Sequence, residues 1–124
     1  MENETKKTAG EIQNSLAQFT GTQHHYKHLF GLTLTDGTKY VAEVCQAYWL
    51  MDIVASYLPK VEKTGNQDFA LVRLTVKDGK ATFTMRADSG EKAFITQQID
   101  YTDFPLGEIE MYLINRVLIL KTEY

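Results

Sequence analysis

The longest uncharged apolar run of this chain lies within residues 39–57, a segment that also holds the only tryptophan and the only cysteine. Large apolar residues recur there at i, i+1, i+4, i+5 and i+8, the spacing of one helical face: Trp49, Leu50, Ile53, Val54 and Tyr57. Burying each of these side chains contributes about 1.5–3 kcal/mol. The segment predicts a central helix that the rest of the chain covers. Pro59 is expected to end this helix, because the residue before a proline is displaced from the helical region.

The size and composition of the chain indicate one domain, residues 1–124, with enough apolar residues for a single core. Residues 1–7 are polar and are expected to be disordered. No stretch approaches the ~20 apolar residues that span a bilayer, and the polar N-terminus does not resemble a secretory signal. A lone cysteine excludes an internal disulfide and fits a reducing compartment. We therefore expect a cytoplasmic protein without a membrane contact.

The N-terminal region predicts a short helix. Thr8 and Glu11 have the spacing of a capping box, in which each side chain binds a free backbone N–H of the other residue. The helix is expected to end at Gly21, which adopts the left-handed conformation at little cost. Its apolar side should dock on the core through three residues: Ile12, Leu16 and Phe19.

The segment before the central run predicts a connector, a strand and a further short element. Residues 23–28 are polar and predict a connector, whereas residues 29–35 alternate in polarity and predict a strand closed by a turn at Asp36-Gly37. Residues 38–44 fit either a hairpin extension or a short helix, and we favour the helix. Residues 61–68 are expected to form a loop.

From residue 69 onward the hydrophobic period changes to two, which is typical of β-strands. Asp78-Gly79 separates the first two alternating segments and predicts a β-hairpin. We expect five strands here, at residues 69–76, 81–86, 92–99, 108–113 and 117–120. A bend is expected at residues 103–107, before the fourth strand. The strands are expected to form an antiparallel meander. The prediction is an α+β fold with an antiparallel sheet of five to six strands packed against two or three helices.

The charges are distributed unevenly along the chain. Residues 87–124 carry seven acidic and three basic residues, so their formal charge is −4, whereas residues 1–86 have a balance of +1. This pattern lacks the basic footprint of a nucleic-acid-binding protein. An acidic surface suits a basic protein partner, because charge complementarity speeds encounter and selects partners. The alternative is a solvated surface that only keeps the protein in solution.

Three histidines form the only candidate metal site. His24 and His28 have helical i, i+4 spacing and, with His25, could bind zinc or nickel. A zinc site needs three or four ligands, and Cys45 or a carboxylate would have to complete this one. The alternative is a solvated polar turn, and we expect no metal and no cofactor.

Catalytic signals are weak elsewhere in the sequence. Cys45 lacks the signature of a thiol enzyme and is expected to be a small buried hydrophobe. Four carboxylates are candidates for acid–base chemistry: Asp36, Glu43, Asp52 and Asp103. Asp36 is explained by its turn, Asp52 by exposure or capping, and Asp103 by an Asx-type turn. We therefore expect a protein that is not an enzyme.

Five segments together resemble a known family: residues 16–22, 35–40, 47–56, 101–106 and 121–124. It is a small single-domain family of uncharacterised proteins from bacteria and their mobile elements, and the resemblance extends to anti-CRISPR inhibitors of Cas9. The family offers no catalytic residues to transfer. Related sequences often have a small turn containing glycine where this chain has Val44-Cys45-Gln46, which argues against a direct role for Cys45.

The resemblance and the acidic C-terminal half together predict a non-enzymatic inhibitor that binds a Cas9-type nuclease with its guide RNA, without binding nucleic acid directly. Carboxylates would face Lys and Arg of the partner, beside two tyrosines: Asp100, Asp103, Glu108 and Glu110, with Tyr101 and Tyr112. One alternative is a metal-binding or enzymatic protein that uses the histidines. Another is an interaction module unrelated to CRISPR. A homodimer could form through an exposed strand edge at residues 117–120.

Overall fold

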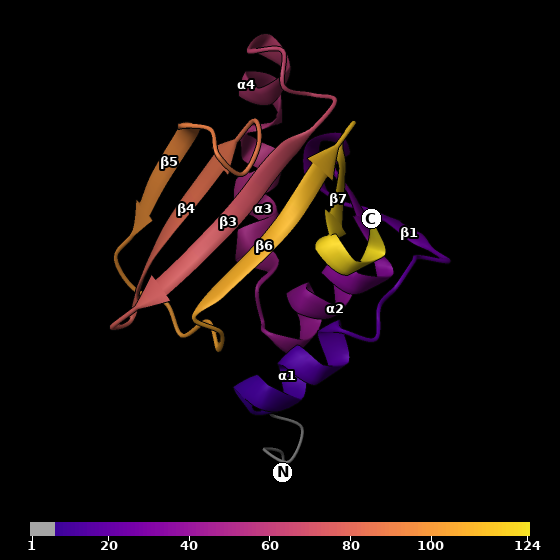
Figure 1. Cartoon of the computed structure of the whole chain (residues 1–124), viewed down its shortest axis with the longest axis vertical. Helices are drawn as coiled ribbons and strands as arrows, with labels where there is room; N and C mark the ends of the chain where they lie inside the picture. The colour runs from indigo at the N-terminus through magenta and orange to yellow at the C-terminus, as the bar shows by residue number, and fades with distance from the viewer. Residues whose placement is uncertain (1–6) are drawn as a thin grey trace.

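The computed structural model describes residues 7–124, which form one mixed sheet with helices on one face (Figure 1). The helical elements are α1 (Ala9–Leu16), η2 (Leu29–Gly31), α2 (Asp36–Val44), α3 (Tyr48–Ser56), α4 (Leu58–Lys63) and η3 (Lys121–Glu123). The strands are β1 (His25–Lys27), β2 (Thr33–Thr35), β3 (Ala70–Lys77), β4 (Lys80–Arg86), β5 (Ala93–Ile99), β6 (Glu108–Ile114) and β7 (Val117–Leu120). The α+β class is confirmed. Residues 1–6, most of the segment expected to be disordered, lie outside the described part.

The strand order in the sheet is β1-β2-β7-β6-β3-β4-β5. Strands β3, β4 and β5 form the expected meander, and Asp78-Gly79 forms the hairpin turn with φ of 54° and 75°. The next strand, β6, does not continue the meander, because it pairs with β3 rather than β5. β7 is antiparallel to β6 and parallel to β2. The expected free edge at residues 117–120 was therefore wrong, because β7 lies inside the sheet.

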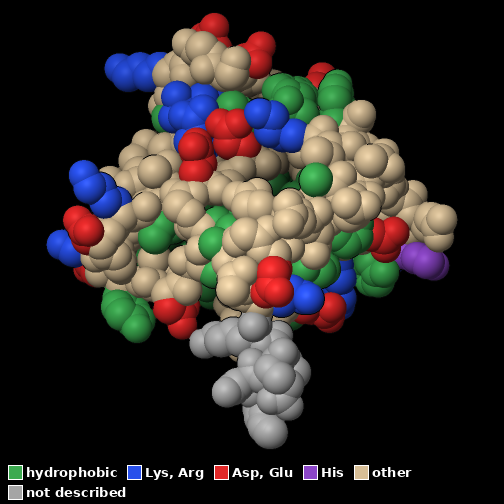
Figure 2. Space-filling model, turned by 60° about the horizontal axis from the view of Figure 1, so that its bottom comes forward, with side chains coloured by type: hydrophobic (Ala, Val, Ile, Leu, Met, Phe, Trp, Pro, Cys, Tyr) green, Lys and Arg blue, Asp and Glu red, His purple; other side chains and the backbone are tan. Residues whose placement is uncertain are grey.

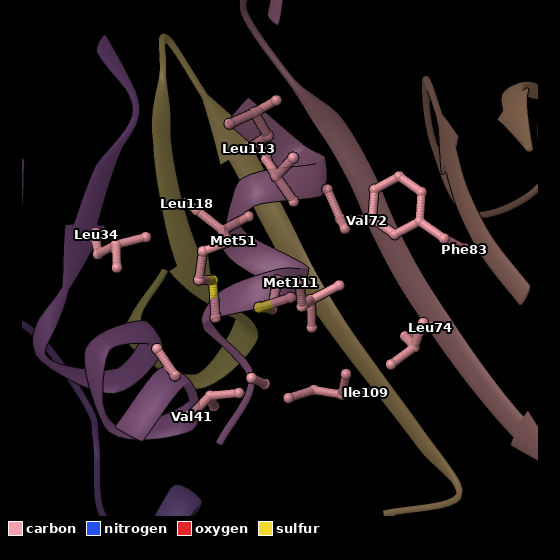
Figure 3. Close-up of a cluster of buried hydrophobic side chains, with 14 of the residues drawn as sticks. Leu34, Val41, Met51, Val72, Leu74, Phe83, Ile109, Met111, Leu113 and Leu118 are labelled. Atoms are coloured by element: carbon pink, nitrogen blue, oxygen red, sulfur yellow. The ribbon is translucent and has the colours of Figure 1, made fainter. Parts of the chain in front are cut away.

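The core lies between the sheet and the helices α2 and α3 (Figure 3). Met51 of α3 lies close to Met111 and Leu118 of the sheet, and all three side chains are buried. α3 buries Leu50 and Val54 of the predicted face, together with Met51 and Ala55. The single tryptophan, Trp49, is only partly buried.

The predicted central helix is divided into separate elements. α2 ends at Val44, and Gln46 has a φ of 51°, so the chain changes direction before α3 begins at Tyr48. Pro59 does not terminate the helical region, because it occupies the first turn of α4, where its missing N–H needs no partner. The expected loop from residue 61 therefore begins later, since α4 extends to Lys63.

The start of α2 corrects the prediction of a turn at Asp36-Gly37. Thr35 caps the helix by accepting a hydrogen bond from Thr38, and Asp36 lies in the first turn. A carboxylate at the start of a helix is favoured by the partial positive charge there. Residues 36–37 therefore begin a helix, and the favoured helical reading of residues 38–44 is confirmed.

Other N-terminal expectations are confirmed in part. The capping box of Thr8 and Glu11 is present, but α1 ends at Leu16, and Gly21 is not among the glycines with positive φ. The polar connector contains β1, which pairs with β2. The expected strand at residues 29–35 is confined to β2, because η2 precedes it. None of the helices in residues 7–124 is long and apolar enough to cross a membrane.

Candidate functional site

The loop of residues 100–107 is held to the body of the protein by alternate residues. Phe104 and Leu106 are buried, and the ring of Phe104 meets Trp49 edge-on at a centroid distance of 6.2 Å. The backbone N–H of Thr102 donates to the carbonyl of Gly79 at 2.8 Å. The hydroxyl of Thr102 accepts from the N–H of Phe104 at 3.1 Å, so Thr102 takes the local turn role expected of Asp103. These contacts fix the conformation of the loop.

Three of the six predicted partner-binding residues project from this loop. Tyr101 is 80% exposed, and Asp100 and Asp103 are also exposed. Neither aspartate is in an ion pair within residues 7–124. We call Asp100, Tyr101 and Asp103 the acidic loop. It presents an aromatic ring and two carboxylates without compensating charge, which is a suitable surface for a basic partner.

The other predicted carboxylates are neutralised within the sheet. Glu110 of β6 lies directly opposite Arg73 of β3, and their side chains form an ion pair at 2.5 Å. Glu110 also binds Lys121 at 2.8 Å, and Glu108 binds Arg73 at 3.2 Å. Lys121 and Arg73 hold the pKa of Glu110 below its usual range despite partial burial. Glu108 and Glu110 therefore have cationic partners inside the chain.

The last predicted residue, Tyr112, belongs to an aromatic cluster. Its ring lies 4.9 Å from that of Phe69 and 5.1 Å from that of Tyr124, and it is half-buried. The structure thus divides the six residues between the acidic loop and β6. On the face shown in Figure 2, acidic side chains are scattered and several lie beside basic ones, so this face is not a continuous acidic surface.

A groove of about 480 Å³ lies between α1 and the sheet. Glu108, Glu110 and Lys121 line it together with apolar residues that include Leu16 and Ile109. The nearby charges compensate one another, so the groove offers apolar contact rather than net charge.

The histidines do not converge on a common point. His24 Nδ1 lies 3.6 Å from Asp36, whereas His28 Nε2 lies 2.7 Å from Asp52. No group of three or more His, Cys, Asp or Glu side chains within residues 7–124 is placed to hold a metal ion. Asp52 therefore serves as a partner of His28 in this structure.

Cys45 is 4% exposed, and burial raises the pKa of its thiol to about 11. A catalytic or metal-binding cysteine must be available as the thiolate, which this environment disfavours. Its burial is as the sequence predicts.

Sequence reasoning missed an aromatic and charged cluster on the N-terminal half. Lys39 Nζ lies 5.1 Å from the ring centre of Tyr26 and 5.7 Å from that of Tyr48. Tyr48 and Glu43 raise the pKa of Lys39. The i, i+4 spacing of Lys39 and Glu43 was a local signal of their ion pair. The two tyrosines come from β1 and α3, and no local pattern indicated that they meet.

A second pocket, of about 370 Å³, also had no sequence signal. It lies where η2, α4 and the turn between β6 and β7 meet, and its lining includes Phe30, Leu58 and Arg116. Arg116 closes one side through two hydrogen bonds to Glu62. Phe30 is 69% exposed and has a φ of 57°, a conformation that is unfavourable for a bulky residue.

The fold and its surface define an α+β protein with an anchored, exposed acidic loop. Residues 10–124 match a family of unknown function, DUF6876, and the chain belongs to this family. The resemblance to an uncharacterised family is therefore confirmed. No curated protein and no solved structure matches the chain.

Proposed function

We propose that this protein acts by binding another protein through the acidic loop, and that it is not an enzyme. The supporting observation is Tyr101, which is 80% exposed although neighbouring residues of its loop are buried. A large aromatic side chain held in water by a fixed loop loses little conformational entropy when a partner covers it. Tyrosines in such positions often contribute much of the binding energy of an interface.

The charge of the loop favours a basic partner. Asp100 and Asp103 form no ion pair within residues 7–124. A Lys or Arg of a partner can therefore bind them without first displacing a basic residue of that part of the chain. Glu108 and Glu110, in contrast, are bound to Arg73 and Lys121. The free carboxylates of the acidic loop are therefore the better contacts. Direct binding to nucleic acid is disfavoured, because phosphates would be repelled.

The finer part of the proposal is an anti-CRISPR role in the bacterial cytoplasm, encoded on a phage or another mobile element. The resemblance described above supports it, together with the chemistry of the target. A Cas9-type nuclease holds its guide RNA and target DNA in positively charged channels. An acidic loop with a projecting tyrosine would occupy part of such a surface and compete with the nucleic acid.

A cleavage assay with a purified Cas9-type nuclease and its guide RNA tests this proposal. Wild-type protein should reduce cutting, and Tyr101→Ala should weaken inhibition by about 30-fold if the ring contributes about 2 kcal/mol. Asp103→Lys should also weaken inhibition, because the variant would face basic residues with a positive charge. Phe30→Ala is a matched control, since it removes a ring that is also largely exposed from a different surface.

Two results would count against the proposal at different levels. Undiminished cutting at large molar excess would remove the Cas9 target. A pull-down from the native host with wild type and Tyr101→Ala would then test the protein-binding role by itself. If wild type and Tyr101→Ala recover every captured protein equally, the acidic loop is not the surface that binds the partner.

A further inference from the structure

Strand β6 is longer than its neighbour β7, so the first part of β6 lacks a strand on one side. β7 pairs with residues 111–114 of β6, and beyond Leu120 the chain turns into η3 (Figure 1). Among the described strands, residues 108–110 of β6 pair only with β3. The sheet therefore has a short open edge at the beginning of β6.

The backbone groups of this edge alternate between the two sides of β6. The carbonyl of Gly107, just before the strand, accepts a hydrogen bond from the N–H of Val76 in β3 at 2.8 Å. Successive residues of an antiparallel strand direct their backbone groups to opposite sides, so Ile109 also faces β3. Glu108 and Glu110 therefore face away from β3. Within residues 7–124, neither glutamate has a backbone partner on that side.

The groove between α1 and the sheet lies along this open edge. Residues 108–110 line the groove, and Gln13 of α1 lies on the opposite wall. The apolar part of its lining comes from side chains that are mostly buried in the core: Leu16, Leu106, Ile109 and Leu120. The groove thus combines free backbone groups with a limited apolar contact. An extended peptide that adds a strand to a sheet uses both features, because backbone hydrogen bonds provide affinity and side-chain contacts provide specificity.

The charge at one end of the groove indicates the chemistry of this peptide. Leu106 lines the groove and belongs to the loop that carries Asp100 and Asp103. Neither aspartate has an ion pair within residues 7–124. A peptide that leaves the groove past Leu106 meets these carboxylates, which favours Lys or Arg at that end of the peptide.

We propose that an extended segment of a basic protein partner binds in this groove and adds a short strand to β6, in line with β7. The segment exchanges backbone hydrogen bonds with Glu108 and Glu110 and places an apolar side chain against the groove. Lys or Arg residues next to it contact the acidic loop. The basic character of the partner rests on the proposed function, whereas the added strand rests on the open edge and the groove.

Hydrogen exchange tests the open edge in the isolated protein. The backbone amides of Glu108 and Glu110 should exchange rapidly, whereas that of Ile109 should be protected by β3. Protection of the Glu110 amide in the isolated protein would overturn the proposal, because another part of the chain or a second copy would then already occupy the groove.

Selection from a phage-displayed library of random decapeptides, with the wild-type protein immobilised, tests the occupant. Enriched peptides should combine an apolar residue with Lys or Arg a few positions away. Synthetic copies of these peptides should protect the amides of Glu108 and Glu110 from exchange. A selection that enriches no sequence, or only sequences without Lys or Arg, would overturn the proposal.

Two variants of one residue separate the backbone from the side chain. Glu108→Pro removes the N–H that faces the groove, and proline is tolerated at the first residue of a strand. Glu108→Ala loses the same carboxylate and its ion pair with Arg73 but keeps the N–H. Glu108→Pro should bind the enriched peptides about tenfold more weakly than Glu108→Ala in fluorescence polarisation. Equal affinities would contradict the added strand.

A second pair of variants leaves β6 intact. Gln13→Trp obstructs the groove from α1 and should weaken binding of the same peptides by about tenfold or more. Asn14→Trp is the matched control, because Asn14 is exposed on α1 but does not line the groove. Asp103→Lys tests the acidic loop separately. Binding lost in Asp103→Lys but kept in Gln13→Trp would overturn the added strand alone, whereas the converse would overturn the acidic loop as the contact of the proposed function.

Discussion

The side chain of Glu123 accepts a hydrogen bond from the backbone N–H of Gly37 at 2.9 Å, across a separation of 86 residues. The same carboxylate accepts from the hydroxyl of Thr35 at 2.7 Å and from the N–H of Leu120 at 3.0 Å. Glu123 is 8% exposed and lies at the N-terminal end of α2, where the helix carries partial positive charge. The end of the chain thus supplies a cap to a helix in its first half.

Removing this carboxylate should destabilise the fold. We expect Glu123→Ala to lower the free energy of unfolding by roughly 3 kcal/mol, because it leaves two buried backbone N–H groups without an acceptor and removes the nearest acceptor of the Thr35 hydroxyl. Glu123→Gln should cost less, since its amide oxygen can still accept. Urea denaturation at neutral pH measures both. A loss below about 0.5 kcal/mol for Glu123→Ala, typical of a surface substitution, would show that water replaces the cap.

A side chain at position 37 should conflict with the same carboxylate. A methyl group on Gly37 would lie 2.5 Å from Glu123 Oε1 and 2.5 Å from Leu120 Cδ1. Gly37→Ala should therefore cost about 1–3 kcal/mol in urea denaturation. Its cost should be smaller in a Glu123→Ala background, because one of the two obstructing side chains is then absent. Strictly additive losses would contradict a direct contact between the two positions.

The ion pairs of Glu110 predict a dependence of stability on pH. Its pKa in the folded protein is lowered by Lys121 and Arg73, so folding favours the ionised form. The stabilisation is fully present above the unfolded pKa of about 4.3 and is lost as the pH falls through the lower folded pKa. Glu110→Gln should be less stable than wild type at pH 7, and the two should converge as the pH falls below the folded pKa of Glu110. Lys121→Met should reduce the same pH dependence, whereas an unchanged profile would argue against these pairs.

The thiol of Cys45 should react slowly in the native protein. Burial raises its pKa to about 11, so at pH 8 about one molecule in a thousand carries the reactive thiolate. Iodoacetamide labelling followed by mass spectrometry should show little modification until urea unfolds the chain. Rapid labelling without urea would mean that Cys45 is accessible and activated, and would reopen its candidacy as a functional residue.

The backbone at Phe30 offers a stabilising substitution. Phe30 has a φ of 57° and is 69% exposed, so its ring gains little from burial while its backbone is strained. Phe30→Asn should stabilise the protein by about 0.5–1 kcal/mol, because asparagine tolerates this conformation. Leu29→Asn is the control, since Leu29 is exposed but is not among the residues with positive φ. A lower melting temperature for Phe30→Asn would show that ring contacts in the pocket outweigh the strain.

Much of the candidate site could not be predicted from the sequence, because its properties depend on which charged side chains form ion pairs in the folded protein. The sequence named Glu108 and Glu110 as partner contacts, but Arg73, 37 residues before Glu110, neutralises them across neighbouring strands. The sequence named Tyr101 as a partner contact without indicating how far its ring would be exposed. Its exposure depends on the burial of Phe104 and Leu106, which follows from packing of the whole chain.

The sequence by itself determined the local elements of this protein: the capped first helix, the apolar face of α3, the Asp78-Gly79 hairpin and the alternating strands. Each of these depends on residues a few positions apart, so its signal is visible in the chain. The tertiary structure decided that β6 pairs with β3, that β7 lies inside the sheet, and that Asp36-Gly37 begins a helix. The start of α2 does have a local cap in Thr35 and Thr38, but Glu123 adds a cap that no local pattern indicates, because its contact with Gly37 spans 86 residues and forms only when the sheet has assembled.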